Sequence, residues 1–274
     1  MTVDLEIICI GNELLIGKVK DTNAHYLAKQ VTKLGANVKR VTVIQDTVQE
    51  ISSSVCEAIA RKPQIIVTTG GLGPTFDDKT LQGIAKAINR KLEINSEALE
   101  MVRQKCLEYA KKRQLSTEIE LTPPRIKMAT LPQKTEVVNN PVGTAPGIRV
   151  EVLGTVLFAL PGVPVEMEAM FNETIAPLIK QSVGSSVFCE RSIFADNIME
   201  SRLAPLIDKV MSDNEDVYVK SHPMRAESKP HVELHLTILA SQEQKPAEKL
   251  AKAAKELGSL IEAECGSVTV ELEG

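Results

Sequence analysis

The alternation of apolar strand-like runs with helix-like segments is the feature that most constrains the fold of this chain. Residues 5–10 form a continuous apolar run that stops at Gly11, as expected for a strand buried on both faces. The helices and strands predicted after it, in chain order, are helix 23–34, strand 38–44, helix 48–60 and strand 65–69. This alternation indicates an α/β fold, with a mainly parallel sheet sandwiched by helices.

The middle of the chain continues the pattern with two helices, two strands and a further helix. We predict helices at 80–87 and 96–113, an exposed polar loop at 114–125, and strands at 148–152 and 156–160. A helix then restarts after two prolines, and its apolar residues recur at helical spacing. They are Met167, Met170, Phe171, Ile175 and Leu178, and the two methionines are expected to be core rather than ligand surface.

The last third of the chain has a different order of elements. It reads as strand 187–195, helix 198–211, strand 217–220, strand 232–239, helix 246–264 and strand 267–272. The order βαββαβ is typical of a ferredoxin-like α+β domain. We therefore predict a larger domain at residues 1–184, binding a nucleotide or phosphate, and a smaller domain at 185–274.

Composition argues against several classes of partner. The formal net charge is -4 and the small domain is acidic, so we expect no nucleic-acid partner. No apolar run approaches membrane-spanning length, so no membrane partner is expected. The five cysteines are widely spaced and odd in number, which favours reduced thiols over a disulfide framework and predicts a cytoplasmic protein.

Three turns follow the first three predicted strands. They are GNELL, with Asn12 and Glu13, then QDT, with Asp46, and TTGGLGPTFDD, with Asp77 and Asp78. In a parallel sheet the carboxyl ends of the strands meet at one edge, where ligands commonly bind. The three turns are therefore predicted to form one site.

The third turn has the composition of a site for a metal-bound phosphate. Gly70, Gly71 and Gly73 allow the backbone to approach a ligand and turn its amides inward. Asp77 and Asp78 could hold a divalent cation, although one of them, Asp78, could instead simply cap the helix that begins near Thr80. A cap requires only one aspartate, so the pair favours the metal.

Two familiar phosphate motifs do not fit these turns. GNELLIGKVK has five residues between its glycines where a Walker A loop has four, and Val19 replaces the magnesium-binding hydroxyl. In the third turn, Phe76 stands where a dinucleotide fingerprint has its last glycine. A P-loop and a Rossmann site are both excluded.

Two later turns flank predicted strands and carry polar residues. NNPVGTAPG spans residues 139–147 and LPGVPVEME spans residues 160–168. Tight strand connections explain Pro141 and Pro146, but they explain Asn140, Thr144 and Glu166 less well.

Together, GNELLIG with DTNA, TGGLGPTFDD, NPVGTAPG and LPGVPVEME resemble the CinA (competence/damage-inducible protein) family. The large domain resembles the molybdopterin-binding fold of the MogA/MoaB and MoeA proteins. The resemblance places Gly70, Gly71, Gly73 and Thr75 in a phosphate loop for a nucleotide or pterin. It implies metal-linked roles for Asp46 and Asp78. It also places on the far wall of the pocket the residues Gly143, Thr144, Gly162 and Glu166.

The resemblance implies hydrolysis of the pyrophosphate of ADP-ribose or a similar nucleotide, with Mg, Mn or Co. In this reading Asp46, Asp77 and Asp78 hold the metal, and Glu13 or Glu166 acts as the base. Two further functions stay open: molybdopterin binding or adenylyl transfer, and a nucleotide sensor without turnover. The family's C-terminal deamidase domain is not expected, because the chain ends at Gly274. Relatives assemble, so a homo-oligomer (dimer or trimer) is expected.

Overall fold

The computed structural model describes residues 3–114, 119–224, 231–264 and 266–270. Its internal contacts divide the chain into two compact units. Unit 1 comprises Met1–Thr32 and Ala36–Ser182, and unit 2 comprises Lys33–Gly35 and Val183–Gly274. Each unit has its own sheet and its own hydrophobic core.

Unit 1 is built on a six-stranded sheet with the order β2-β1-β3-β8-β7-β6. The first four of these strands are mutually parallel, and β7 is antiparallel to both of its neighbours, β8 and β6. Their bounds are β1 (Asp4–Ile10), β2 (Asn37–Ile44), β3 (Ile65–Thr69), β6 (Glu136–Val138), β7 (Gly147–Val152) and β8 (Thr155–Leu160). Strands β1 and β3 lie inside the sheet and are almost fully buried, because helices cover both faces there.

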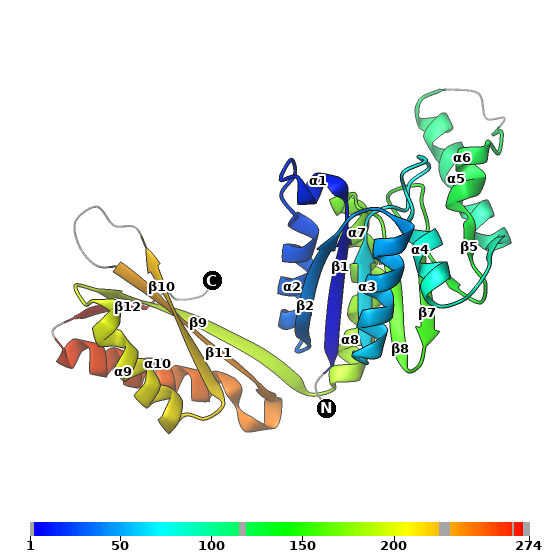
Figure 1. The fold of residues 1–274 in the computed structure, drawn as a ribbon. Coiled ribbons are helices and arrows are strands. Elements are labelled where there is room, and N and C mark those ends of the chain that lie inside the picture. Colours follow the sequence, from blue (N-terminus) through cyan, green and yellow to red (C-terminus); the bar gives the residue numbers. More distant parts are fainter. Residues whose placement is uncertain (1–2, 115–118, 225–230, 265, 271–274) are drawn as a thin grey trace. The chain divides into compact units, whose positions relative to one another are not determined.

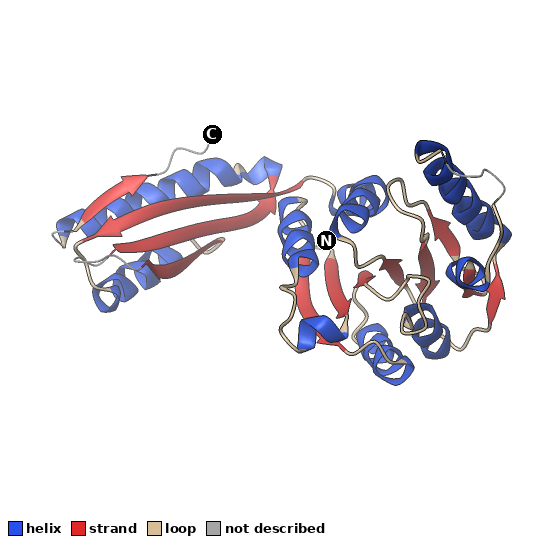
Figure 2. Ribbon diagram, turned by 90° about the horizontal axis from the view of Figure 1, so that it is seen from above, coloured by secondary structure: helices blue, strands red, loops and turns tan. Residues whose placement is uncertain are grey.

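Helices lie on both faces of this sheet (Figures 1 and 2). They are α2 (Thr22–Lys33), α3 (Val48–Ala60), α4 (Thr80–Ala87), α7 (Pro164–Met170), the π-helical turn η1 (Phe171–Ile175) and α8 (Ala176–Val183). The start of α3 is capped by Thr47, whose hydroxyl accepts from the Glu50 amide at 3.3 Å, and Asp21 accepts from the Ala24 amide at 2.9 Å at the start of α2. Local capping thus sets where both helices begin.

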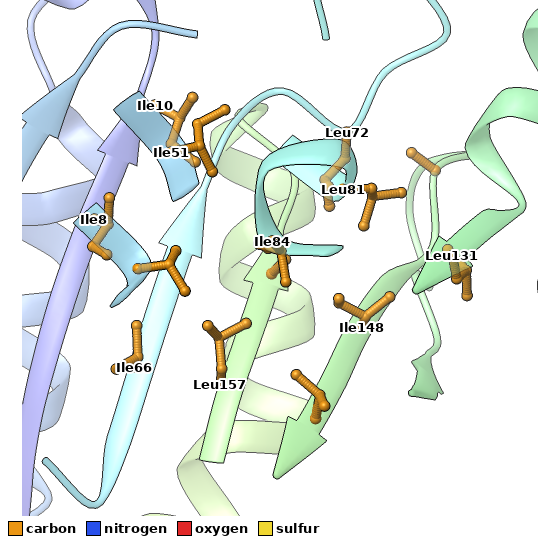
Figure 3. Close-up of a cluster of buried hydrophobic side chains, with 14 of the residues drawn as sticks. Ile8, Ile10, Ile51, Ile66, Leu72, Leu81, Ile84, Leu131, Ile148 and Leu157 are labelled. Carbon is orange, nitrogen blue, oxygen red and sulfur yellow. The ribbon is translucent and has the colours of Figure 1, made fainter. Parts of the chain in front are cut away.

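The main core of unit 1 lies between the sheet and helices α3 and α4 (Figure 3). It is aliphatic, and burying each large side chain of this kind contributes about 1.5–3 kcal/mol. Its members drawn with labels are Ile8, Ile10, Ile51, Ile66, Leu72, Leu81, Ile84, Leu131, Ile148 and Leu157. Because Ile10 and Leu72 belong to it, the core extends up to the loops at the carboxyl ends of the strands.

The segment between α4 and β6 differs most from the sequence prediction. Helix α5 (Ser96–Lys112) agrees with it, but β4 (Leu92–Ile94), which pairs with β5 (Thr130–Pro132), has no counterpart in it. The predicted loop 114–125 is wrong at its end, because α6 (Pro123–Met128) begins there, while 115–118 lie outside the described residues. Proline is favoured in the first helical turn, where its missing N–H group costs no hydrogen bond.

Two other regions differ in detail from the prediction. The GNELL turn contains a short helix, α1 (Asn12–Leu15). The predicted apolar helix face is buried at Met167, Met170, Phe171 and Ile175. Leu178 is only half-buried, because the π-helical turn before it shifts the helical register.

Unit 2 is a four-stranded antiparallel sheet with the order β10-β11-β9-β12. Its elements are β9 (Ser186–Asp196), α9 (Glu200–Asp213), β10 (Val217–Met224), β11 (His231–Ser241), the 3-10 turn η2 (Gln242–Gln244), α10 (Pro246–Ala263) and β12 (Ser267–Val270). This is the βαββαβ order of a ferredoxin-like domain. The predicted fold class is therefore confirmed for both parts of the chain. No helix in the described part of the chain is long and apolar enough to cross a membrane.

Candidate functional site

A large pocket lies where the four parallel strands of unit 1 end. Its volume is about 1030 Å³, and the loops that follow β1, β2, β3 and β8 all contribute to its wall. Most of the predicted site residues line it: Asn12, Glu13, Asp46, Gly70, Gly71, Gly73, Asp77, Asp78, Thr144, Gly162 and Glu166. Residues far apart in the sequence meet here because parallel strands bring their carboxyl ends to the same edge.

The glycine loop after β3 cannot be built from other residue types at two of its positions. Gly70 and Gly71 have φ angles of 103° and 63°, in the left-handed region that favours glycine. A Cβ atom at Gly70 would collide with the carbonyl oxygen of Ile10, and one at Gly71 would lie 2.6 Å from Oδ2 of Asp46. The loop thus approaches the neighbouring strand and a carboxylate as closely as a backbone can.

Hydrogen bonds hold this loop against the elements around it. The Gly70 amide donates to the carbonyl of Leu160 at 3.0 Å. The hydroxyl of Thr80, in the first turn of α4, donates to the Gly70 carbonyl at 2.8 Å, and the Thr80 amide donates to the Gly71 carbonyl at 3.2 Å. These hydrogen bonds fix the start of the loop to the end of β8 and to the first turn of α4.

Asp46 is the carboxylate whose environment is most perturbed. Its Oδ1 accepts a hydrogen bond of 3.0 Å from the backbone amide of Lys79, and its own amide donates to Asn12 at 3.3 Å. Burial raises the pKa of Asp46 from 3.8 to about 6, and the nearby charges of Asp78 and Asp77 add to the rise. A carboxyl group with this pKa becomes protonated as the pH falls through about 6.

Asp77 and Asp78 instead close a tight turn around Thr75. Oδ2 of Asp78 accepts from the Thr75 amide at 2.8 Å and from its hydroxyl at 2.6 Å, and Asp77 is also within hydrogen-bond distance of that hydroxyl. The hydrogen bond to Thr75 lowers the pKa of Asp77. Helix α4 has Lys79 at its N-cap position with no side-chain cap, so the hypothesis that Asp78 simply caps the helix is wrong.

The predicted three-carboxylate metal site is not assembled in this arrangement. No group of three potential metal-ligating side chains occurs among the residues that the structure describes. Asp46 and Asp78 both line the pocket, but Asp78 and Asp77 turn toward Thr75. Magnesium often binds only one or two carboxylates, with phosphate oxygens of a ligand completing its coordination. Asp46 and Asp78 could provide such a pair of carboxylates.

Three predicted ligand-binding residues, Thr75, Asn140 and Gly143, do not line the pocket. Asn140 is 3% exposed, and its Nδ2 donates to the Ala145 carbonyl at 2.9 Å and to Oε2 of Glu166 at 2.7 Å. Its Oδ1 accepts from the Gly143 amide at 2.7 Å, and a Cβ at Gly143 would collide with the Glu166 carboxylate. Asn140 and Gly143 therefore orient Glu166, which does face the pocket.

The prediction missed one wall of the pocket, which comes from α5 and α6. It is formed by Cys106, Tyr109, Thr122, Pro124, Arg125 and Met128. This wall adds an aromatic ring, a thioether and a guanidinium group, and Lys20 adds a second cation from the loop before α2. A Thr-Pro pair is a usual helix start, so TPPR was the sequence signal for α6.

A further cation, Lys127 of α6, contacts the glycine loop from outside this pocket. Its Nζ donates to the carbonyls of Gly73 and Thr75 at 2.9 and 2.7 Å and lies 3.9 Å from Oδ2 of Asp78. Burial lowers the pKa of Lys127, while the charge of Asp78 acts in the opposite direction. The loop is thus held by α6 as well as by α4.

Known proteins and a known family resemble this chain over the residues that form the pocket. The family described as "Probable molybdopterin binding domain" matches residues 6–181, which include every element that contributes to the pocket. A protein of Aeropyrum pernix is 42% identical over 266 residues, covering 94% of this chain and 96% of the relative. A protein of Sulfurisphaera tokodaii is 42% identical over 253 residues, covering 92% of each.

A solved structure supports the same assignment. The crystal structure of the protein CinA from Thermoplasma acidophilum, a protein of unknown function, is 38% identical to this chain. The match has a TM-score of 0.57 and covers 64% of this chain and 98% of that one.

Proposed function

The chain belongs to the family of probable molybdopterin binding domains and to the CinA family, and from this premise we propose that its pocket binds a pterin that carries phosphate. The observation that carries the proposal is the convergence of the glycine loop, the carboxylates of Asp46 and Asp78 and the α5–α6 wall on one pocket of about 1030 Å³. This volume is larger than a phosphate needs and suits a ligand with a ring and a phosphate group.

Different residues of the pocket support different parts of such a ligand. Gly70, Gly71 and Gly73 provide backbone at close range for phosphate oxygens, and Lys20 and Arg125 provide positive charge. On the α5–α6 wall, Tyr109 and Met128 provide polarizable surface on which a planar heterocycle can pack. The proposal thus assigns phosphate to the glycine loop and the ring to α5 and α6.

A divalent metal is part of the proposal as a bridge between protein and phosphate. Asp46 and Asp78 would hold it, with phosphate oxygens of the ligand completing the coordination. When bound, the metal would neutralise phosphate charge and polarise the phosphoryl group. Asp77 is not required, because magnesium needs only one or two carboxylates when phosphate oxygens complete its coordination.

The experiment that tests binding is a calorimetric titration of the purified protein with a pterin that bears a diphosphate side chain. ADP-ribose is titrated in parallel, and both are measured with magnesium and with a chelator. We expect saturable binding of the pterin that weakens in the chelator and in Asp78→Asn. Asp4→Asn, at the opposite end of β1, should bind as the wild type does. Absence of saturable pterin binding by the wild type would overturn the proposal.

A second candidate is hydrolysis of ADP-ribose or a similar nucleotide, and one observation favours it. In this second candidate Asp46 would act as the base rather than as a metal ligand, because its pKa of about 6 suits a group that takes a proton from water near neutral pH. Glu166, oriented by Asn140, and Glu13 are the other carboxylates on the wall. Metal-dependent release of AMP in the same titration samples, lost in Asp78→Asn, would support hydrolysis.

Adenylyl transfer and nucleotide sensing give different results when ATP is added to these samples. Adenylyl transfer requires ATP to be consumed when the pterin is added, with diphosphate released. A nucleotide sensor would bind ADP-ribose without turnover and would not bind the pterin. The homo-oligomer and the cytoplasmic location stay predictions, and sedimentation analysis of the purified protein tests the first.

A further inference from the structure

Lys127 is a cation placed behind the phosphate-binding loop rather than in the pocket. Its side chain is 29% exposed, and its ammonium group contacts the carbonyl oxygens of Gly73 and Thr75 and Oδ2 of Asp78. The pairing closes a network, because Asp78 in turn accepts hydrogen bonds from the amide and hydroxyl of Thr75. One ammonium group therefore holds both the backbone of the loop and the carboxylate that ends it.

The glycine loop lies between two cavities, and Lys127 lines only the smaller one. This smaller cavity has a volume of about 340 Å³ and also contacts Leu81, Pro123 and Ile126. Gly71, Gly73 and Asp78 line both cavities. The loop is thus a thin wall, with the proposed phosphate site on one side and Lys127 on the other.

The direction of the loop carbonyls decides whether the loop attracts or repels an anion. A carbonyl oxygen turned toward a phosphate would repel it, whereas an amide N–H would attract it. Lys127 draws two carbonyl oxygens to its own side. Since the peptide bond is planar and trans, the amide of Phe76, which follows Thr75, points away from Lys127. Gly73 is followed by Pro74, which has no N–H, so at that position Lys127 only keeps a carbonyl oxygen away from the anion.

We propose that Lys127 is a positioning residue for the anion site: it holds the carbonyls of Gly73 and Thr75 on the far side of the loop and keeps Asp78 in place, without touching the ligand. The inference rests on the phosphate-binding function proposed above and adds a residue from α6, a helix that the glycine motif does not include. It also explains why both α4 and α6 contact the glycine loop: the Lys127 side chain joins the α5–α6 wall to this loop.

The first test needs no ligand. Hydrogen exchange of the loop amides, measured by mass spectrometry, is compared in the wild type, Lys127→Met and a matched control, Arg90→Met. Arg90 is also a cation that donates to backbone carbonyls, those of Gln133, Lys134 and Glu151 at 3.1, 2.7 and 3.5 Å, but it does not line the pocket. We expect at least about tenfold faster exchange in residues 72–80 of Lys127→Met only, because hydrogen bonds to charged donors are strong.

The second test measures anion binding with inorganic diphosphate and magnesium. We expect the Kd to rise at least about tenfold in Lys127→Met, with Lys127→Arg recovering part of the affinity because it keeps the charge and the donors. Thermal melting of each variant checks that it is folded, and Lys127→Arg provides a readout if the methionine variant is not.

The outcomes separate this inference from the proposed function. Unchanged loop exchange in Lys127→Met, or equal acceleration in Arg90→Met, would overturn the positioning role. Unchanged diphosphate affinity with faster exchange would also overturn it, because Lys127 would then order the loop without affecting anion binding. If the wild type binds neither diphosphate nor the pterin, the proposed function fails, while the exchange data still decide whether Lys127 orders the loop.

Discussion

Asp46→Asn should stabilise the folded protein at neutral pH, although it removes a residue from the candidate site. The pKa of Asp46 is raised from 3.8 to about 6, so ionisation of this carboxyl group is less favourable in the folded than in the unfolded chain. The folded state therefore holds the proton over this pH range, and stability falls as the pH rises from about 4 to about 6. Asparagine keeps an oxygen for the Lys79 amide and has no charge to bury.

The size of the effect follows from the two pKa values. A rise from 3.8 to about 6 corresponds to about 3 kcal/mol, at about 1.4 kcal/mol for each pKa unit. Asp46 is only half-buried, and solvent screening reduces the expected cost to about 1–2 kcal/mol. The free energy of unfolding of Asp46→Asn, relative to the wild type, should therefore increase by about 1–2 kcal/mol between about pH 4 and about pH 7.5.

Urea denaturation followed by circular dichroism, in a chelator to keep metals from Asp46, measures this difference. Asp77→Asn is the control, because a hydrogen bond lowers the pKa of Asp77. The stability that Asp77 contributes is present above its ordinary pKa and lost as the pH falls, so the pH dependence of its variant should have the opposite sign. A pH-independent difference for Asp46→Asn, or destabilisation at about pH 7.5, would refute the reasoning.

Two further substitutions test the walls of the pocket. Gly71→Ala, at φ 63°, should cost more stability than Gly154→Ala, at φ 84°, because only the first Cβ would meet neighbouring atoms. Denaturation of both variants measures the difference in stability that this crowding causes, expected at about 1–3 kcal/mol. Equal losses of stability in the two variants would contradict the prediction. Asn140→Asp removes the donor to Ala145 and places a second charge beside Glu166, so we expect a loss of about 2–4 kcal/mol. Adding Glu166→Gln should recover part of that loss, and a double-mutant cycle measures the recovery.

Much of the fold is predictable because its signals are local. The apolar run of β1, the Thr47 cap of α3 and the glycine after β3 each act within a few residues. The short strands β4 and β5 escape prediction, because three residues carry too little periodicity. The prolines of α6 indicate a loop if they are read as helix breakers, but in the structure they occupy the first helical turn.

The site divides in the same way. The glycines and Asp46 can be identified from the sequence because they follow predicted strands, and all parallel strands end at one edge. The direction in which each side chain points cannot be identified in this way. Asn140 and Thr75 have polar side chains in suitable loops, yet both bond to the protein itself rather than facing the pocket.

The sequence by itself therefore determined the α/β and ferredoxin-like units and the edge of the sheet where the candidate site lies. Periodicity, caps and glycine positions specify these features, and each depends on neighbours in the chain. Only the tertiary structure decided that Asp46 has a raised pKa, that the three aspartates do not form one metal cluster, and that Lys127 lies behind the glycine loop. Those features depend on distances between residues that are far apart in the sequence, such as Asp46 and Lys79 or Gly73 and Lys127. Strand order and side-chain packing set these distances.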